Sequence, residues 1–328
     1  MNRRLRIVTV GGGTGQYGLL SGLRSVPAQL TAIVTMMDSG GSSGRLRDEY
    51  GVLPPGDFTR CLIALSHHPD AMKQLLGHRF VGGTMRGHTV RNLVFTALHE
   101  LTGDSAAVVE RLHEIFAVDA RVLPVTLDRA ELVMHLENDQ VFRGEAAIDG
   151  LGLLLPARVL SVYLDPSAHA FAPALDALRS ADLIILGPGD LYTSVVPNLL
   201  VEGVTEAIAE SSAKLLYVCN LMTKPNETPG YAVEDFVATI AMHLGRARLD
   251  SVLVNLAWPE GPPAEYAAEG SEPVVFRSPS NAGEPLYFTG DLAQHGRLVR
   301  HDPVKLAAAV VDLARGWFGK AGSLTGLR

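Results

Sequence analysis

Short apolar runs constrain the fold of this chain most strongly. Five of them read IVTV, TAIVTMM, DLIILGPGD, KLLYVCN and SVLVN, at residues 7–10, 31–37, 182–190, 214–220 and 251–255. Their apolar parts are continuous rather than alternating, which is typical of parallel strands covered on both faces. Helical patterns follow at residues 14–23, 199–209 and 233–244. This alternation predicts an α/β fold, a doubly wound, mostly parallel Rossmann-like sheet with right-handed crossovers.

The middle of the chain departs from this pattern. Residues 57–116 show helical patterns, and residues 121–147 alternate between apolar and polar side chains. Alternation predicts antiparallel strands with one face in water. We therefore expect a Rossmann-like nucleotide-binding core at residues 1–56 and 157–318, an inserted helical and antiparallel cap at residues 57–156, and a loose tail at residues 319–328. The loop-rich segment 258–272 is expected to be exposed.

Charge and composition exclude several classes of protein. The 328-residue chain carries a formal net charge of -7, which argues against a nucleic-acid partner held by phosphate neutralisation. No run reaches the roughly 18 apolar residues of a membrane span, and the N-terminus lacks the apolar stretch of a signal peptide. Cys61 and Cys219 lie in apolar runs and are expected to be buried free thiols in a reducing compartment. These features predict a cytoplasmic protein.

A glycine-rich loop follows the first predicted strand. In GGGTGQYG, at residues 11–18, Gly13, Gly15 and Gly18 fit the G-x-G-x-x-G spacing, and Asp38 lies 20 residues after Gly18. This arrangement matches a dinucleotide-binding fingerprint, in which backbone N–H groups and a helix N-terminus approach phosphate. A tight strand-to-helix turn that binds nothing is the alternative. The residues expected to contact phosphate here are Gly12, Gly13, Thr14 and Gly15.

A second polar segment follows the strand at residues 31–37. SGGSSGRLR, at residues 39–47, offers N–H groups, hydroxyls and two guanidinium groups suited to phosphate. A flexible linker is the alternative, but this is the end of a strand where α/β sheets bind ligands. The expected ligand contacts are Asp38, Ser39, Gly40, Gly41, Ser42, Arg45 and Arg47. Asp57, after the Pro54-Pro55 turn, is expected as the N-cap of the next helix, with catalysis as its alternative role.

Three later segments add candidate residues. GPGDLYTSVVPNLL, at residues 187–200, is either a second ligand loop or an ordinary strand-to-helix connection. In GHTVRNL, His88 and Asn92 are four residues apart on one helical face, so we expect His88 as an N-cap or a catalytic residue and Asn92 facing the cleft. Lys224 in CNLMTKPNETPGY is expected to face water, with contact to a phosphate as the alternative. The ligand candidates from these segments are Asn92, Gly187, Gly189, Tyr192, Thr193, Ser194, Asn198 and Asn220.

The motifs together carry a resemblance to a known family. GGGTG, DSGGSSGRLRDEYGVLPPGD, GHTVRNL, GPGDLYTSVVPNL and YVCNLMTKPNETPGY occur in the same order as in the gluconeogenesis factors, which are related to the 2-phospho-L-lactate transferases. The sequence resembles this family over about residues 6–313. The resemblance implies a Rossmann-like core that binds UDP-sugars, with a role in cell shape and wall synthesis on gluconeogenic carbon. The transferases move a phospholactyl group from a nucleotide to a deazaflavin with a divalent metal.

One departure from the family pattern bears on a metal site. Many relatives carry two acids before the double glycine, whereas here Asp38 is followed by Ser39. Hard divalent cations prefer clustered oxygen ligands, so Mg²⁺ would have Asp38 and Asp57 as its candidate ligands. Asp190 stands where some relatives have serine, and it either restores an acid to the cleft or caps the next helix. The candidate catalytic residues are Asp38, Asp57, Asp190 and His88.

Three functions follow from these observations. The first is a UDP-sugar-binding regulatory protein that meets a protein partner through its cap. The second is a metal-dependent phospholactyl transferase, and the weakest is an NAD(P)-binding protein. Mg²⁺ is the one cofactor considered, and no redox cofactor is expected. A homodimer is expected because two-fold dimers are the commonest assembly.

Overall fold

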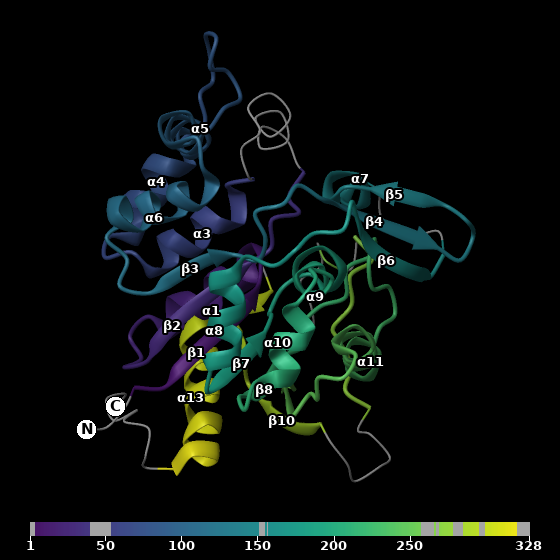
Figure 1. Cartoon of the computed structure of the whole chain (residues 1–328). Helices are drawn as coiled ribbons and strands as arrows, with labels where there is room; N and C mark the ends of the chain where they lie inside the picture. Colours follow the sequence, from purple (N-terminus) through teal and green to yellow (C-terminus); the bar gives the residue numbers. More distant parts are fainter. Residues whose placement is uncertain are drawn as a thin grey trace.

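A seven-stranded parallel sheet forms the centre of the described chain (Figure 1). The computed structural model describes residues 4–39, 54–150, 155, 157–256, 266, 269–277, 285–294 and 299–319. Neighbouring strands of the sheet all pair in parallel, which confirms the predicted α/β fold. In order across the sheet, the strands are β10 (Leu286–Gly290), β9 (Ser251–Asn255), β8 (Lys214–Val218), β7 (Leu183–Leu186), β1 (Arg6–Gly11), β2 (Gln29–Val34) and β3 (Arg121–Pro124).

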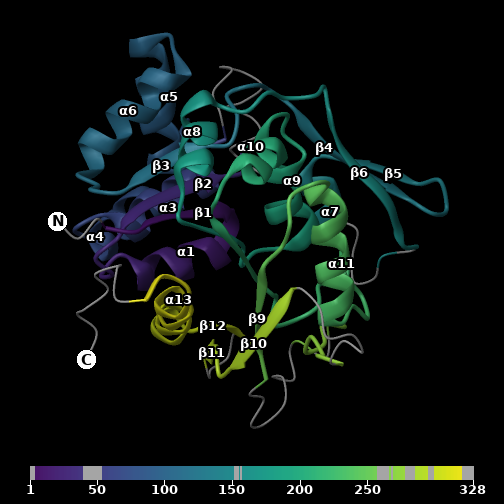
Figure 2. The ribbon, with the colours of Figure 1, turned by 60° about the horizontal axis from the view of Figure 1, so that its bottom comes forward.

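Helices cover both faces of the sheet (Figure 2). One face packs against α1 (Gly13–Leu23), α3 (Gly56–Leu65) and α13 (Pro303–Phe318). The other packs against α8 (Ala172–Ser180), α10 (Val204–Glu210) and α11 (Val233–Leu244). Ile7 and Val8 of β1 are both buried but belong to the two opposite cores, which explains why the strand is a continuous apolar run.

The remaining elements form smaller groups around this sheet. The helices α4 (Pro69–Gly77), α5 (Val90–Thr102) and α6 (Ser105–Phe116) lie beside α3 and β3 (Figure 1). The antiparallel unit, which we define as β4 (Glu131–Leu136), β5 (Val141–Arg143), α7 (Glu145–Asp149) and β6 (Val159–Asp165), has the strand order β5-β4-β6. A π-helical turn (Leu191–Val195) leads into α9 (Val196–Leu199), and β11 (Ala293–Gln294) pairs with β12 (Arg300–His301).

One strand differs from the sequence-based expectation. The antiparallel prediction for residues 121–147 is right for β4 and β5 but wrong for β3, which pairs in parallel with β2 at the edge of the main sheet. An edge strand is short and has only one neighbour, so its sequence does not show the long apolar run of a central strand. The division of the chain into core, cap and tail stays a prediction, and residues 320–328 lie outside the described part.

The chain reverses direction across the sheet between β1 and β7. From β1 the chain proceeds through α1 to β2 on one side, whereas β7 leads to β8 on the other side. The loops after β1 and β7 therefore leave the sheet edge in opposite directions. Such a switch point at the carboxyl ends of the strands is where open α/β sheets bind ligands.

The described residues bear on two expectations, that the chain spans no membrane and that its cysteines are free. None of the helices described there has the length and apolar character to cross a bilayer. Cys61 and Cys219 are both buried and free, as expected.

A histidine on α6 makes the fold sensitive to acid. Nδ1 of His113 lies 2.8 Å from the Val109 carbonyl oxygen, and Nε2 accepts the Val122 N–H at 2.8 Å. The ring is therefore neutral, and burial lowers the pKa of His113, with Arg121 lowering it further. Because the folded pKa is below the unfolded one of about 6.5, this stability is present above pH 6.5 and is lost as pH falls below it.

We expect His113→Gln to be less stable than the wild-type chain at pH 7.5 and to lose less stability between pH 6.5 and pH 5. Urea denaturation of both proteins at pH 7.5, 6.5 and 5 checks this. An identical loss of stability in both proteins between pH 6.5 and pH 5 would contradict the role given to His113.

Candidate nucleotide-binding site

Two of the predicted ligand loops touch at the switch point. Gly15 packs so closely against the Pro188 carbonyl group that a Cβ atom there would collide with it. A Cβ atom at Gly189 would lie 3.3 Å from the Gly12 carbonyl oxygen. Gly187 has φ +74°, a conformation that favours glycine. These glycines bring the loops after β1 and β7 into direct contact.

A pocket of about 370 Å³ opens beside this contact. Its wall includes Thr14 and Gly15 from the first turn of α1, and Gly189 and Asn220 from the loops after β7 and β8. Asn220 is held in place because its Nδ2 donates to the Gly189 carbonyl at 2.9 Å and its Oδ1 accepts from the Tyr217 hydroxyl at 3.2 Å. The pocket thus joins the ends of three central strands.

Another part of the pocket wall comes from residues outside the sequence motifs. Tyr266, Arg300 and His301 line it. The Tyr266 hydroxyl accepts the Val299 N–H at 3.1 Å, so the ring is tied to the segment that carries Arg300. Burial lowers the pKa of His301 to about 4, so its ring is neutral at pH 7. The segment 258–272 was expected to be exposed, yet Tyr266 within it is half-buried.

Asp57 occupies part of the glycine loop. Its Oδ2 accepts the Gly13 N–H at 2.7 Å, and its Oδ1 forms an ion pair with Arg60 at 2.8 Å. The prediction that Asp57 is an N-cap is wrong, since Pro55 is the N-cap of α3 and Asp57 lies in the first turn. Burial raises the pKa of Asp57, and Arg60 lowers it. The Gly13 amide therefore already has an acceptor within the protein.

Further carboxylates gather on the Asp57 side of the loop. Burial and the charges of Asp38, Asp57 and Asp149 together raise the pKa of Glu145 to about 9. Ser39 accepts the Ala146 N–H at 3.1 Å, which places the start of α7 over the end of β2. Among the described residues, no three His, Cys, Asp or Glu side chains are arranged to hold a metal ion. Magnesium bound by Asp38 and Asp57 stays a proposal.

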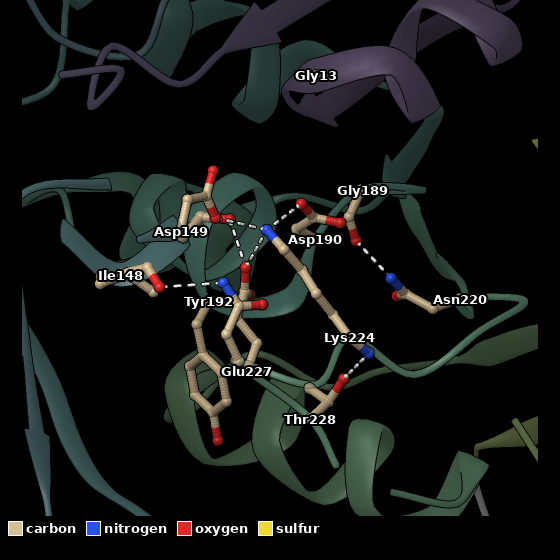
Figure 3. A network of polar contacts seen from close by, with 12 residues as sticks. Gly13, Ile148, Asp149, Gly189, Asp190, Tyr192, Asn220, Lys224, Glu227 and Thr228 are labelled. Atoms are coloured by element: carbon tan, nitrogen blue, oxygen red, sulfur yellow. Dashed lines mark hydrogen bonds and ion pairs between the residues drawn. The ribbon is translucent and has the colours of Figure 1, made fainter. Parts of the chain in front are cut away.

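A cluster of one lysine and three carboxylates connects the loops after β7 and β8 with α7 (Figure 3). Nζ of Lys224 lies 2.8 Å from Asp149, 2.7 Å from Asp190 and 2.7 Å from Glu227. We call these four residues the Lys224 cluster. Lys224 does not simply face water, which corrects the expectation from sequence. Asp190 supplies no side-chain cap to the π-helical turn, so the interpretation of this residue as an acid of the cleft is the better one.

The predicted ligand contacts after β7 lie mostly inside the protein. Glu227 accepts hydrogen bonds from the Tyr192 N–H and the Thr193 hydroxyl, both at 2.8 Å. Nδ2 of Asn198 donates to the Ser194 carbonyl at 2.8 Å, and Asn198 is fully buried. These buried contacts fix the conformation of the loop after β7. Of the predicted residues, the pocket wall itself contains Thr14, Gly15, Gly189, Asp190 and Asn220.

The residues predicted on α5 lie on the cap side. Thr89, and not His88, is the N-cap of this helix, and it accepts the Asn92 N–H. Asn92 is buried. Burial and the charge of Arg60 lower the pKa of the neighbouring Arg91, whereas the charge of Asp38 raises it. The predicted residues Gly40, Gly41, Ser42, Arg45 and Arg47 lie outside the described residues.

Comparison with known proteins identifies the family. The model of the 2-phospho-L-lactate transferase CofD family matches residues 7–283. The chain belongs to this family. Within the CofD family it is similar to the gluconeogenesis factor of Bacillus subtilis, with 38% identity over 96% of this chain and all of that protein. The gluconeogenesis factor of Halalkalibacterium halodurans is 36% identical over 94% of this chain and 97% of its own length.

A solved structure agrees with the fold of this CofD-family chain. The crystal structure of a UPF0052-family protein from Bacillus halodurans superposes with a TM-score of 0.88 and 36% identity. The match covers 94% of this chain and 99% of that one. The resemblance expected from the sequence motifs is thereby confirmed.

Proposed function

We propose that the chain is a nucleotide-sugar-binding regulatory protein whose ligand is a UDP-sugar. The observation that carries this proposal is the pocket at the switch point, whose wall combines the first turn of α1, an arginine and a tyrosine. The similarity of the chain to gluconeogenesis factors supports a role in cell shape and wall synthesis on gluconeogenic carbon. We further propose a protein partner that meets the cap.

The pocket chemistry suits a base linked to a diphosphate. The first N–H groups of a helix have no partner within the helix and favour anions. The N-cap Gly12 forms no side-chain hydrogen bond, so the Thr14 and Gly15 amides stay open to a ligand. Arg300 offers a fork of donors to phosphate, and the Tyr266 ring offers a face to a base. These groups account for a phosphate and a base in one pocket.

A transferase is the second candidate, and the acids beside the glycine loop favour it. The charge of Asp38 raises the pKa of Asp57, and the charges of both raise the pKa of Glu145, so these carboxylates lie near one another and would favour a divalent cation. Turnover of a nucleotide–phospholactate donor with a deazaflavin and Mg²⁺ would support this candidate. NAD(P) binding is the weakest alternative, because the Gly13 amide that would approach a pyrophosphate is already bonded to Asp57.

Titration calorimetry with UDP-N-acetylglucosamine and Mg²⁺ tests the proposal. We expect saturable heat with one ligand per chain. No heat and no thermal shift at millimolar ligand would contradict it.

Replacing Arg300 with alanine is expected to weaken UDP-N-acetylglucosamine binding about 10- to 100-fold, because a hydrogen bond to a charged group contributes about 1.5–3 kcal/mol. Arg300 is an exposed residue at the rim of the pocket, so the fold should not change. Arg246→Ala is the matched control, since Arg246 is exposed and lies outside the pocket wall. Equal affinities of the two variants would contradict the placement of the phosphate.

A further inference from the structure

We propose that Lys224 is shared between the bound ligand and Asp149, so that ligand binding loosens α7 from the core. This inference rests on the proposed function, because it gives that pocket a means of regulation. Lys224 lines the pocket and at the same time forms an ion pair with α7. The antiparallel unit that contains α7 would then report whether the pocket is occupied.

The geometry of the Lys224 cluster identifies which of its ion pairs can be exchanged. The Glu227 side chain is fully buried and also accepts from Tyr192 and Thr193, so it is fixed. The side chains of Asp149 and Asp190 are each 46% exposed. Asp190 belongs to the same pocket wall as Lys224. Asp149 is therefore the exposed partner of Lys224 that does not line the pocket. A phosphate in the pocket can replace it as an acceptor for Lys224.

The ammonium group is well suited to such an exchange. It is a compact charge with three donors on a flexible stem, so it can keep Glu227 while one donor turns to a new acceptor. The three carboxylates around it outnumber its single charge. A phosphate arriving in the pocket would attract Lys224 and repel Asp149, and both effects weaken the contact between them.

Few polar contacts hold α7 to the rest of the molecule besides Lys224. In the described chain, Ala146 N–H donates to Ser39, and Asn226 Nδ2 donates to the Ile148 carbonyl at 3.0 Å. Glu145 at the start of α7 lies near Asp38 and Asp57, and with a pKa of about 9 it is protonated at neutral pH, so it adds no ion pair that would hold the helix. Ile148 is fully buried and keeps α7 near the core. Loss of the Lys224 contact should thus loosen α7 without unfolding the antiparallel unit.

The first test compares ligand affinity among three variants. Because coupling between two sites is reciprocal, Asp149→Asn removes the competitor for Lys224 and is expected to bind UDP-N-acetylglucosamine about 3- to 10-fold more tightly than wild type. Lys224→Met is expected to bind at least about 10-fold more weakly. Asp139→Asn is the matched control, an exposed residue of the same unit with the same charge change, and its affinity should equal that of wild type. Wild-type affinity in Asp149→Asn would overturn the inference.

The second test measures amide hydrogen exchange in α7. In wild type, saturating UDP-N-acetylglucosamine should raise the exchange of Ala146–Gly150 about 5- to 10-fold, whereas Asp149→Asn should show the raised rate without ligand. Ligand binding that leaves this exchange unchanged would overturn the inference while the proposed function stands. If wild type binds no UDP-sugar, the proposed function fails. The ligand-free proteins then test whether the Lys224–Asp149 ion pair holds α7: equal exchange in wild type and Asp149→Asn would show that it does not.

Discussion

Replacing Glu227 with alanine is expected to lower the free energy of unfolding by about 2–4 kcal/mol, because two buried donors lose their acceptor while Lys224 keeps Asp149 and Asp190. The Tyr192 N–H and the Thr193 hydroxyl would lose their acceptor in a buried place, where an unsatisfied polar group costs about 1–3 kcal/mol. Urea denaturation followed by circular dichroism measures the change.

Glu227→Gln is the matched variant for this prediction. It keeps the shape and an acceptor oxygen but removes the charge, so about 1–2 kcal/mol should be lost, the range of an ordinary hydrogen bond. A loss below about 1 kcal/mol in the alanine variant would show that Glu227 does not hold the loop after β7 in place.

Two glycines of α1 are expected to respond to alanine with opposite signs. A methyl group at Gly22 would collide with the Pro303 carbonyl and come within 2.9 Å of the Ala307 Cβ, so Gly22→Ala should destabilise the protein by about 1–3 kcal/mol. At Gly18 the nearest heavy atom would be 4.0 Å away, so Gly18→Ala should stabilise the helix by about 0.5–1 kcal/mol.

Chemical denaturation of both glycine variants checks this prediction. Each variant is the control for the other, because the substitution and the helix are the same. If both changed stability in the same direction, the close approach of α1 and α13 at Gly22 would not be the cause.

The glycine pair also shows what the sequence motif can and cannot predict. G-x-G-x-x-G correctly indicated a strand, a tight turn and a helix at the edge of a parallel sheet. The spacing assigned importance to Gly18, whereas close packing falls on Gly15 and Gly22. Which glycine touches a neighbour depends on how α13 and the loop after β7 dock, and these segments lie far away in the sequence.

Central strands were predictable because two-sided burial leaves a continuous apolar run. β3 was not, since a four-residue edge strand beside an alternating segment resembles the antiparallel strands that follow it. The same limit applies to the site. Gly189 and Asn220 lie at the ends of predicted strands, Thr14 begins the predicted helix after the first strand, and all three line the pocket. Tyr266 and Arg300 reach it from segments without a local signal.

Charge pairing was the hardest feature to predict. Lys224 and Asp149 are separated by 75 residues, and Asp57 meets Gly13 across 44 residues. A lysine in a polar loop, such as Lys224, is ordinarily exposed to water. An aspartate before a helix, such as Asp57, ordinarily caps that helix. The fold overrides both explanations because it brings these segments together at one edge of the sheet.

A crystal structure of the chain with UDP-N-acetylglucosamine and Mg²⁺ would show whether the switch-point pocket holds the ligand. We expect difference density for the diphosphate between the Thr14 and Gly15 amides and the Arg300 guanidinium, with the base against Tyr266. Density for the ligand against Asp38 and Asp57 on the cap side, with this pocket empty at saturating ligand, would contradict it.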